Sequence, residues 1–133
     1  HSSKFAVEGF TESLRQELAQ FNINVILIEP GGIRSNFIDN SKNAKNYNPE
    51  NSPYAGTIQK LFEGIQSIMA DSSHPRDVAE VILKVVNTSS PNVRYPVGKD
   101  AESVLKARTE LSDKELEKWV RESYMDKKGF VRQ

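Results

Sequence analysis

The chain has 133 residues, of which 37% are hydrophobic and 27% charged, a balance that suits one small domain or part of a larger one and argues against wholesale disorder. Its 18 lysines and arginines balance 18 aspartates and glutamates, which excludes a strong general attraction to nucleic acid or to an anionic membrane. The lack of cysteine excludes disulfides, thiolate nucleophiles and cysteine-based metal sites, and it fits a reducing compartment.

No targeting or membrane-spanning segment is visible in the sequence. The longest apolar run, residues 25–28, is far too short to cross a bilayer, and no basic segment followed by an apolar one marks a signal peptide. We therefore expect a cytoplasmic protein with no membrane partner and no nucleic-acid partner.

The spacing of large apolar residues predicts a first helix over residues 4–20. Four of them recur at helical intervals and share one face: Phe10, Leu14, Leu18 and Phe21. Gly9 interrupts this helix at a cost of about 1 kcal/mol relative to alanine. Close approach of another helix would explain why a glycine stands there.

The run that follows predicts a buried strand over residues 24–28. It is continuously apolar and rich in β-branched residues, which is typical of a parallel strand covered on both faces. Pro30, Gly31 and Gly32 then end it abruptly. A helix, a buried strand and a glycine turn in this order form the second half of a β-α-β unit, so we expect an α/β fold.

A long polar segment comes next, in which asparagine recurs between residues 36 and 54. Such a segment inside a compact domain is usually functional or mobile. A second helix is predicted over residues 55–69, where apolar side chains return at helical spacing: Ile58, Leu61, Phe62, Ile65 and Ile68 or Met69.

A third helix is expected to begin at Pro75, because proline is tolerated in a first turn and Asp77 there complements the helix dipole. We assign His74 to the helix start rather than to a metal site, since no other metal-ligating residue clusters with it. The predicted buried stripe of this helix consists of Val78, Ile82, Val85 and Val86.

A second strand is predicted over residues 94–97, and Pro96 within it favours an edge strand or a bulge. Ser112 and Glu115 have the spacing of a capping box at the start of a fourth helix. The apolar side of that helix is made of Leu116, Trp119 and Val120. Residues 127–133 are expected to fray.

Two strands and four helices make a thin core, which is marginal for an independent domain. The sequence contains no internal repeat and no second domain boundary. We therefore interpret residues 1–133 as a single partial domain that pairs with a partner chain or belongs to a longer protein.

Several motifs occur in a fixed order along the chain: "SSK" at the head of the first helix, "PGGIRSNF" after the first strand, then "HPRDVAEVI" and "RYPVGKDA". Residues 2–101 thereby resemble the C-terminal half of a classical short-chain dehydrogenase/reductase. The resemblance implies the last two strands of a Rossmann-type, doubly wound parallel sheet. It also implies a parent enzyme that transfers hydride between NAD or NADP and a carbonyl or alcohol substrate. The "PGG" turn disfavours the extended members of the superfamily, which work on nucleotide sugars.

The resemblance matches Lys4 to the active-site lysine of the family. A tyrosine four residues earlier would then lie immediately before His1, and the catalytic serine and the glycine-rich turn would also lie upstream. An ammonium lowers the tyrosine pKa from about 10, and a spacing of four places both side chains on one helical face. In the family the lysine also binds the nicotinamide ribose. We expect the isolated chain to be inactive; the alternative for Lys4 is a solvated lysine in a first helical turn.

The turn after the first strand resembles the family's nicotinamide-binding turn, at the sheet edge where α/β folds bind ligands. The resemblance assigns Pro30 and Gly31 to the bend, Ile33 to a backbone contact with the carboxamide, and Ser35 to a hydroxyl contact that is usually made by threonine. A plain turn that ends a strand is the alternative.

Residues 36–56 resemble the substrate-binding segment of the family. Phe37 and Tyr54 in this segment are candidates for lining a substrate pocket, or equally for anchoring the loop to the rest of the fold. The "RYPVGKDA" motif resembles the last strand and following turn of dehydrogenases that act on steroids, retinoids or a broad range of carbonyl substrates, which points toward an apolar ketone or alcohol.

The resemblance also implies a homo-oligomer, because the first helix lies at a dimer interface in the family and Gly9 would suit close approach there.

Two further interpretations of the function stay open beside the enzyme. One is a non-catalytic interaction module that assembles through exposed helix faces and the sheet edge. The other is a pseudoenzyme that binds nucleotide without catalysis.

Overall fold

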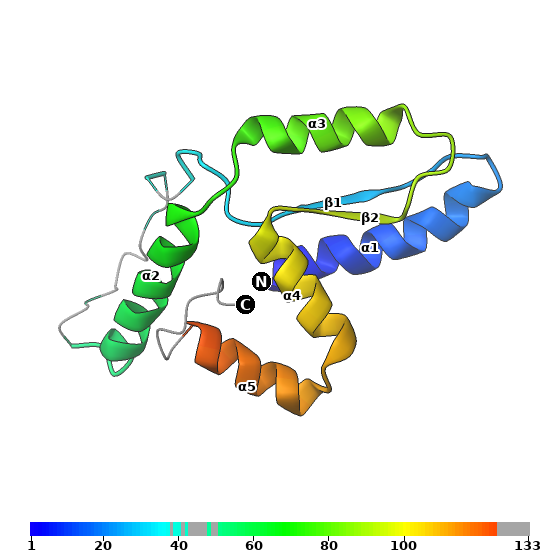
Figure 1. Ribbon diagram of the computed structural model, residues 1–133. Coiled ribbons are helices and arrows are strands. Elements are labelled where there is room, and N and C mark those ends of the chain that lie inside the picture. Colours follow the sequence, from blue (N-terminus) through cyan, green and yellow to red (C-terminus); the bar gives the residue numbers. More distant parts are fainter. Residues whose placement is uncertain (38, 41, 43–47, 49–50, 125–133) are drawn as a thin grey trace.

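The computed structural model describes residues 1–37, 39–40, 42, 48 and 51–124. Helices and strands follow one another in this order: α1 (Ser2–Ala19), β1 (Leu27–Pro30), α2 (Ala55–Ala70), α3 (Pro75–Val86), β2 (Arg94–Val97), α4 (Lys99–Glu110) and α5 (Asp113–Tyr124) (Figure 1). The predicted α/β class is confirmed.

The two strands pair in parallel, with Leu27 opposite Arg94 and Pro30 opposite Val97. Helix α3 covers one face of the pair, and α1 and α4 lie toward the opposite face (Figure 1). Helices on both faces of a parallel sheet are the arrangement of a doubly wound fold, of which this chain provides the C-terminal part.

Pro96 lies where the strand can tolerate it. The carbonyls of Val93 and Val97 accept hydrogen bonds from Leu27 and from the residue after β1, Gly31. Because backbone groups alternate in direction along a parallel strand, Pro96 between them faces away from β1. Its missing N–H therefore falls on the open edge of the sheet, as the edge-strand prediction requires.

The buried stripe of α3 differs from the predicted one. Val85 is buried and Val78 and Val81 are half-buried, whereas Ile82 is 45% and Val86 is 77% exposed. The prediction was wrong at Ile82 and Val86 because the helix meets the sheet along the 78–81–85 row. Ile82 and Val86 lie one residue further round the helix, beyond the strands.

Strand β1 begins at Leu27 rather than at residue 24, so its predicted start was wrong. The residues before it are fixed by a side chain instead of a strand partner: Arg15 on α1 donates from Nε to the carbonyl of Val25 at 2.9 Å. The same guanidinium donates to the carbonyl of Val93 at 3.3 Å and thereby joins α1 to the segments that lead into both strands.

Helix α4 is an addition to the four helices expected from the sequence. It begins after Gly98, which has a φ of 103°, and its buried side chains are two alanines, Ala101 and Ala107. Small buried residues in a charged segment give a weak periodic signal, which explains why the helix was missed.

Helix α5 starts as predicted, because the N–H of Ser112 donates to Glu115 at 2.9 Å and the N–H of Glu115 donates back to the Ser112 hydroxyl at 3.5 Å. The Ser112 hydroxyl also donates to the Glu115 carboxylate at 2.6 Å, and this bond is the main cause that lowers the pKa of Glu115, with the Ser112 N–H adding to it. The predicted fraying of residues 127–133 lies outside the described residues.

The core of the described residues is thin, as the sequence indicates. Its buried hydrophobic members are Leu27, Val85, Val97, Ala101 and Ala107. Helix α1 illustrates the consequence: Leu14 and Leu18 are half-buried, whereas Phe10 and Phe21 are 67% and 66% exposed. None of the helices in the described part of the chain is long and apolar enough to cross a membrane.

Candidate functional site

A cavity of about 1010 Å³ opens at the carboxyl end of β1. The start of α1, the turn after β1, and helices α2 and α4 form its walls. Six of the seven site residues predicted from the sequence line it, namely Lys4, Pro30, Gly31, Ile33, Ser35 and Phe37. The fold therefore brings together residues that are far apart in the sequence, at the sheet edge where α/β proteins bind ligands.

The two aromatic candidates of the substrate-like segment have different positions. Phe37 lines the cavity although 79% of it is exposed, which places it at the rim. Tyr54 is 67% exposed, precedes α2 as its N-cap residue, and is not part of the cavity wall. Several positions of the segment, 38, 41, 43–47 and 49–50, lie outside the described residues.

Lys4 lies in the first turn of α1, where its backbone N–H donates to the carbonyl of His1 at 3.0 Å. Glu8 follows one turn later on the same face and would be its natural ion-pair partner. The carboxylate of Glu8 is bound to Arg94 instead. Within the described residues Lys4 forms no ion pair, although it lines the cavity together with Glu8, Glu29 and Asp100.

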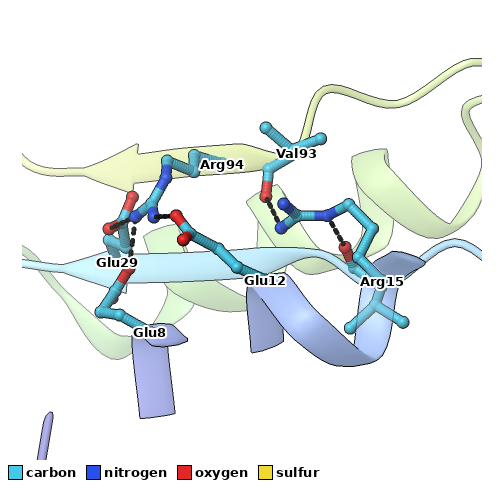
Figure 2. A network of polar contacts seen from close by, with 7 residues as sticks. Glu8, Glu12, Arg15, Glu29, Val93 and Arg94 are labelled. Atoms are coloured by element: carbon cyan, nitrogen blue, oxygen red, sulfur yellow. Dashed lines mark hydrogen bonds and ion pairs between the residues drawn. The ribbon is translucent and has the colours of Figure 1, made fainter. Parts of the chain in front are cut away.

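Arg94 on β2 gathers three carboxylates around one guanidinium (Figure 2). It binds Glu8 and, at 2.9 Å, Glu12, both on α1, and it binds Glu29 on β1 at 2.7 Å. We call these four residues the Arg94 cluster. It ties the helix that carries Lys4 to both strands. Sequence reasoning missed it, because its members come from three distant elements.

The cluster has an excess of negative charge. Burial is the main cause that raises the pKa of Glu29; the positive charge of Arg94 opposes this shift, and the carboxylate of Glu8 adds to it. One carboxylate oxygen of Glu29, Oε2, is buried without a hydrogen-bond partner among the described residues. The three acceptors in turn raise the pKa of Arg94, with the hydrogen bond to Glu8 as the largest cause.

The turn after β1 is held on one side by Ser73, which follows α2. The N–H of Ser73 donates to the carbonyl of Gly32 at 2.9 Å, and the N–H of Arg34 donates to the carbonyl of Ser73 at 3.0 Å. Ile33 lies opposite Ser73 in this short parallel bridge. In a planar trans peptide the C=O and N–H point in opposite directions, so the N–H and C=O of Ile33 point away from Ser73.

His74 has the helix-start role that the sequence predicts. Its Nδ1 accepts a hydrogen bond from the N–H of Arg76 at 3.1 Å, and its own N–H donates to Asp77 at 2.8 Å. Among the residues that the structure describes, no group of three or more histidine, aspartate or glutamate side chains is arranged to hold a metal ion.

The comparisons with known proteins agree with this geometry. The family model for short chain dehydrogenases matches residues 1–47, the part that carries Lys4 and the glycine turn. The chain is therefore similar to the short-chain dehydrogenase/reductase family. The predicted resemblance is therefore confirmed.

Curated relatives extend this similarity across most of the chain. It is 34% identical over 119 residues to oxidoreductase BOA17 of Botryotinia fuckeliana, which covers 89% of this chain and 42% of that protein. It is 35% identical over 97 residues to 3-ketodihydrosphingosine reductase of Bacteroides thetaiotaomicron, covering 73% and 36%. It is 36% identical over 110 residues to the uncharacterized oxidoreductase YusZ of Bacillus subtilis, covering 81% and 39%. The chain thus spans less than half the length of these relatives.

Proposed function

We propose that this chain forms the nicotinamide end of the active site of an NAD(P)(H)-dependent oxidoreductase that interconverts a carbonyl and an alcohol. The observation that carries the proposal is the convergence of Lys4 and the turn after β1 on one cavity. The similarity of the chain to a family of oxidoreductases supports the same conclusion.

The backbone of the turn fits a nicotinamide carboxamide. A carboxamide offers two N–H donors and one carbonyl acceptor. Ile33 directs one N–H and one C=O away from Ser73, and the hydroxyl of Ser35 is close by along the chain. The Ser35 oxygen accepts a hydrogen bond from the N–H of Phe37 at 3.4 Å, which leaves its proton available to a ligand. We propose that these groups bind and orient the nicotinamide of NAD or NADP.

Lys4 would assist the proton transfer that carbonyl reduction requires. When bound, the cofactor supplies the hydride, and negative charge then develops on the substrate oxygen. The unpaired ammonium of Lys4 would lower the pKa of a tyrosine one helical turn earlier, which makes proton donation effective near neutral pH. The same ammonium would hold the nicotinamide ribose by a hydrogen bond.

The side chains of the cavity wall support the proposal that the substrate is an apolar carbonyl compound. The walls on α2 and α4 carry mainly hydrophobic side chains: Phe62, Ile65, Ile68, Met69, Val104 and Leu105. A surface of this kind favours a substrate with an aliphatic or aromatic body. One relative is named as a reductase of a 3-ketosphingoid substrate, which supports the same class.

We also propose that the protein is a homo-oligomer that assembles through α1. Phe5 and Phe10 on this helix are 72% and 67% exposed, and the space beside Gly9 is open within 4 Å. An exposed apolar face with room beside a glycine suits close packing against a second helix.

The lack of cysteine supports a cytoplasmic location.

Reduction assays test the proposal directly. The full-length protein that carries this chain should oxidise NADH or NADPH in the presence of apolar ketones, and the isolated 133-residue chain should not. Nucleotide binding without turnover would favour the pseudoenzyme. Neither binding nor turnover, with the chain engaged in a stable complex, would favour the interaction module.

A further inference from the structure

One carboxylate on α4 contacts the turn after β1, which Ser73 also contacts. Asp100, the second residue of α4, accepts a hydrogen bond at Oδ2 from the N–H of Gly32 at 2.5 Å, across 68 positions of sequence. The proposed function gives Asp100 no role, yet its side chain lines the same cavity as Lys4.

Two glycines leave the space that this carboxylate occupies. A Cβ at Gly31 would overlap the carboxylate group of Asp100. A Cβ at Gly98 would lie 2.8 Å from Oδ1 of Asp100 and 2.9 Å from the Ser73 hydroxyl, and its φ of 103° is itself one that glycine adopts readily. The end of β1 and the end of β2 are therefore both shaped around Asp100.

The contacts of Asp100 and Ser73 fix consecutive backbone groups of the turn. Asp100 holds the N–H of Gly32, and Ser73 holds the carbonyl of Gly32 and the N–H of Arg34. Ser73 thereby holds the two peptide planes on either side of Ile33, and Asp100 holds the plane that precedes them, between Gly31 and Gly32. The direction of the Ile33 N–H and C=O is set by contacts outside the residues that would touch a ligand.

We propose that Asp100 is a positioning residue that orients the backbone of Ile33 toward the nicotinamide carboxamide. This inference deepens the proposed function and rests on it. A carboxylate suits the role because a charge-assisted hydrogen bond is stronger than a neutral one. Asp100 also lies in the first turn of α4, where the helix dipole favours a negative charge.

The test compares three variants of the full-length protein: Asp100→Ala, Asp100→Asn and Glu102→Gln. Glu102→Gln is the matched control, because it removes one negative charge from the same helical turn. The Glu102 side chain is exposed and does not line the cavity. Steady-state kinetics with NADH and NADPH report on nicotinamide positioning. Calorimetric binding of ADP-ribose, which lacks the nicotinamide, reports on the rest of the cofactor site.

Asp100→Ala should raise the KM for the reduced cofactor by roughly tenfold to a hundredfold, the equivalent of one charge-assisted hydrogen bond, and should leave ADP-ribose binding unchanged. Asp100→Asn keeps an acceptor oxygen and should stay within about threefold of the unaltered protein, as should Glu102→Gln. Should Asp100→Ala fail to fold, Asp100→Leu with Gly31 left unchanged gives a second neutral variant for the same measurement.

Three results would overturn the positioning role: unchanged kinetics in Asp100→Ala, equal losses of ADP-ribose and reduced-cofactor binding, or equal losses in Asp100→Ala and Asp100→Asn. Failure of the proposed function has a different signature. In that case the unaltered protein would show no NADH or NADPH turnover at all, and the role of Asp100 would be rejected together with the function.

Discussion

The guanidinium of Arg94 lies 2.7 Å from a carboxylate oxygen of Glu29 on the neighbouring strand. This pair is the inner part of the Arg94 cluster, since only 16% of the Glu29 side chain is exposed. Because Arg94 also binds Glu8, the pair connects the sheet to the helix turn that follows Lys4. The cluster thus sets the position of α1 against β1 and keeps Glu8 away from the ammonium of Lys4.

Replacement of Arg94 should destabilise the protein and also affect the site. Arg94→Met leaves three carboxylates without their cation, and we expect the free energy of unfolding to fall by about 2–3 kcal/mol. Glu8 would become free to pair with Lys4, so turnover should also fall. Urea unfolding and steady-state kinetics of the full-length protein measure the two effects.

Arg108→Met provides the control for Arg94→Met. Arg108 pairs with Asp113 at 2.9 Å, but the two side chains are 57% and 94% exposed. An exposed pair of this kind contributes about 1 kcal/mol or less. Equal losses of stability in the two variants would contradict the structural role of the Arg94 cluster.

Stability should depend on pH through Glu29. Its pKa is raised in the folded protein, so the folded state still holds a proton at pH values where the unfolded chain has lost it. The free energy of unfolding should therefore fall as the pH rises from the ordinary value of 4.5 toward the raised value. Glu29→Gln should flatten this part of the profile in urea unfolding at pH 4 to about 7.

Glu17→Gln is the control for this pH profile, because Glu17 is exposed on α1 and takes no part in the Arg94 cluster. Its profile should follow that of the unaltered protein. A Glu29→Gln profile that keeps the full decline would show that another group is responsible.

Gly31→Ala should disturb the turn after β1, because the added methyl group would overlap the carboxylate of Asp100. Overpacking of this kind costs about 1–3 kcal/mol and should be partly relieved when Asp100→Ala is added. Gly56→Ala is the matched control, since nothing lies within 4 Å of its added methyl group and alanine favours a helix by about 0.5–1 kcal/mol. Additive effects of Gly31→Ala and Asp100→Ala would argue against the contact.

The exposed face of α1 should mediate assembly. Phe10→Asp places a charge on this face and should reduce the mass of the full-length protein in light scattering to that of a smaller species. Leu83→Asp on α3 is the control, because Leu83 is 64% exposed on a different helix. If Leu83→Asp dissociates the oligomer and Phe10→Asp does not, the interface lies on α3 and not on α1.

Local patterns in the sequence predicted much of the fold. The continuous apolar run before Pro30 indicated a parallel strand, and Pro96 indicated an edge position; both predictions agree with the structure. The family resemblance selected six residues that the fold brings to one cavity, although Tyr54 lies apart from it. What these predictions share is a signal contained within a few neighbouring residues.

The features that the sequence did not reveal depend on distant partners. Nothing in the spacing of Glu8, Glu29 and Arg94 indicates that they meet, because each belongs to a different element. Asp100 stands within the "RYPVGKDA" motif, but only the folded chain places it against Gly32. Helix α4 buries alanines, whose contribution to a periodic pattern is small.

The most direct test of the central claim is the turnover of the full-length protein with and without the ammonium of Lys4. We expect Lys4→Met to lower the rate of NADH- or NADPH-dependent ketone reduction by about 10²–10⁴-fold, which is the typical contribution of general acid–base catalysis. Lys99→Met, at the exposed start of α4, is the matched control and should leave the rate unchanged. A Lys4→Met variant that keeps the full rate would contradict the account.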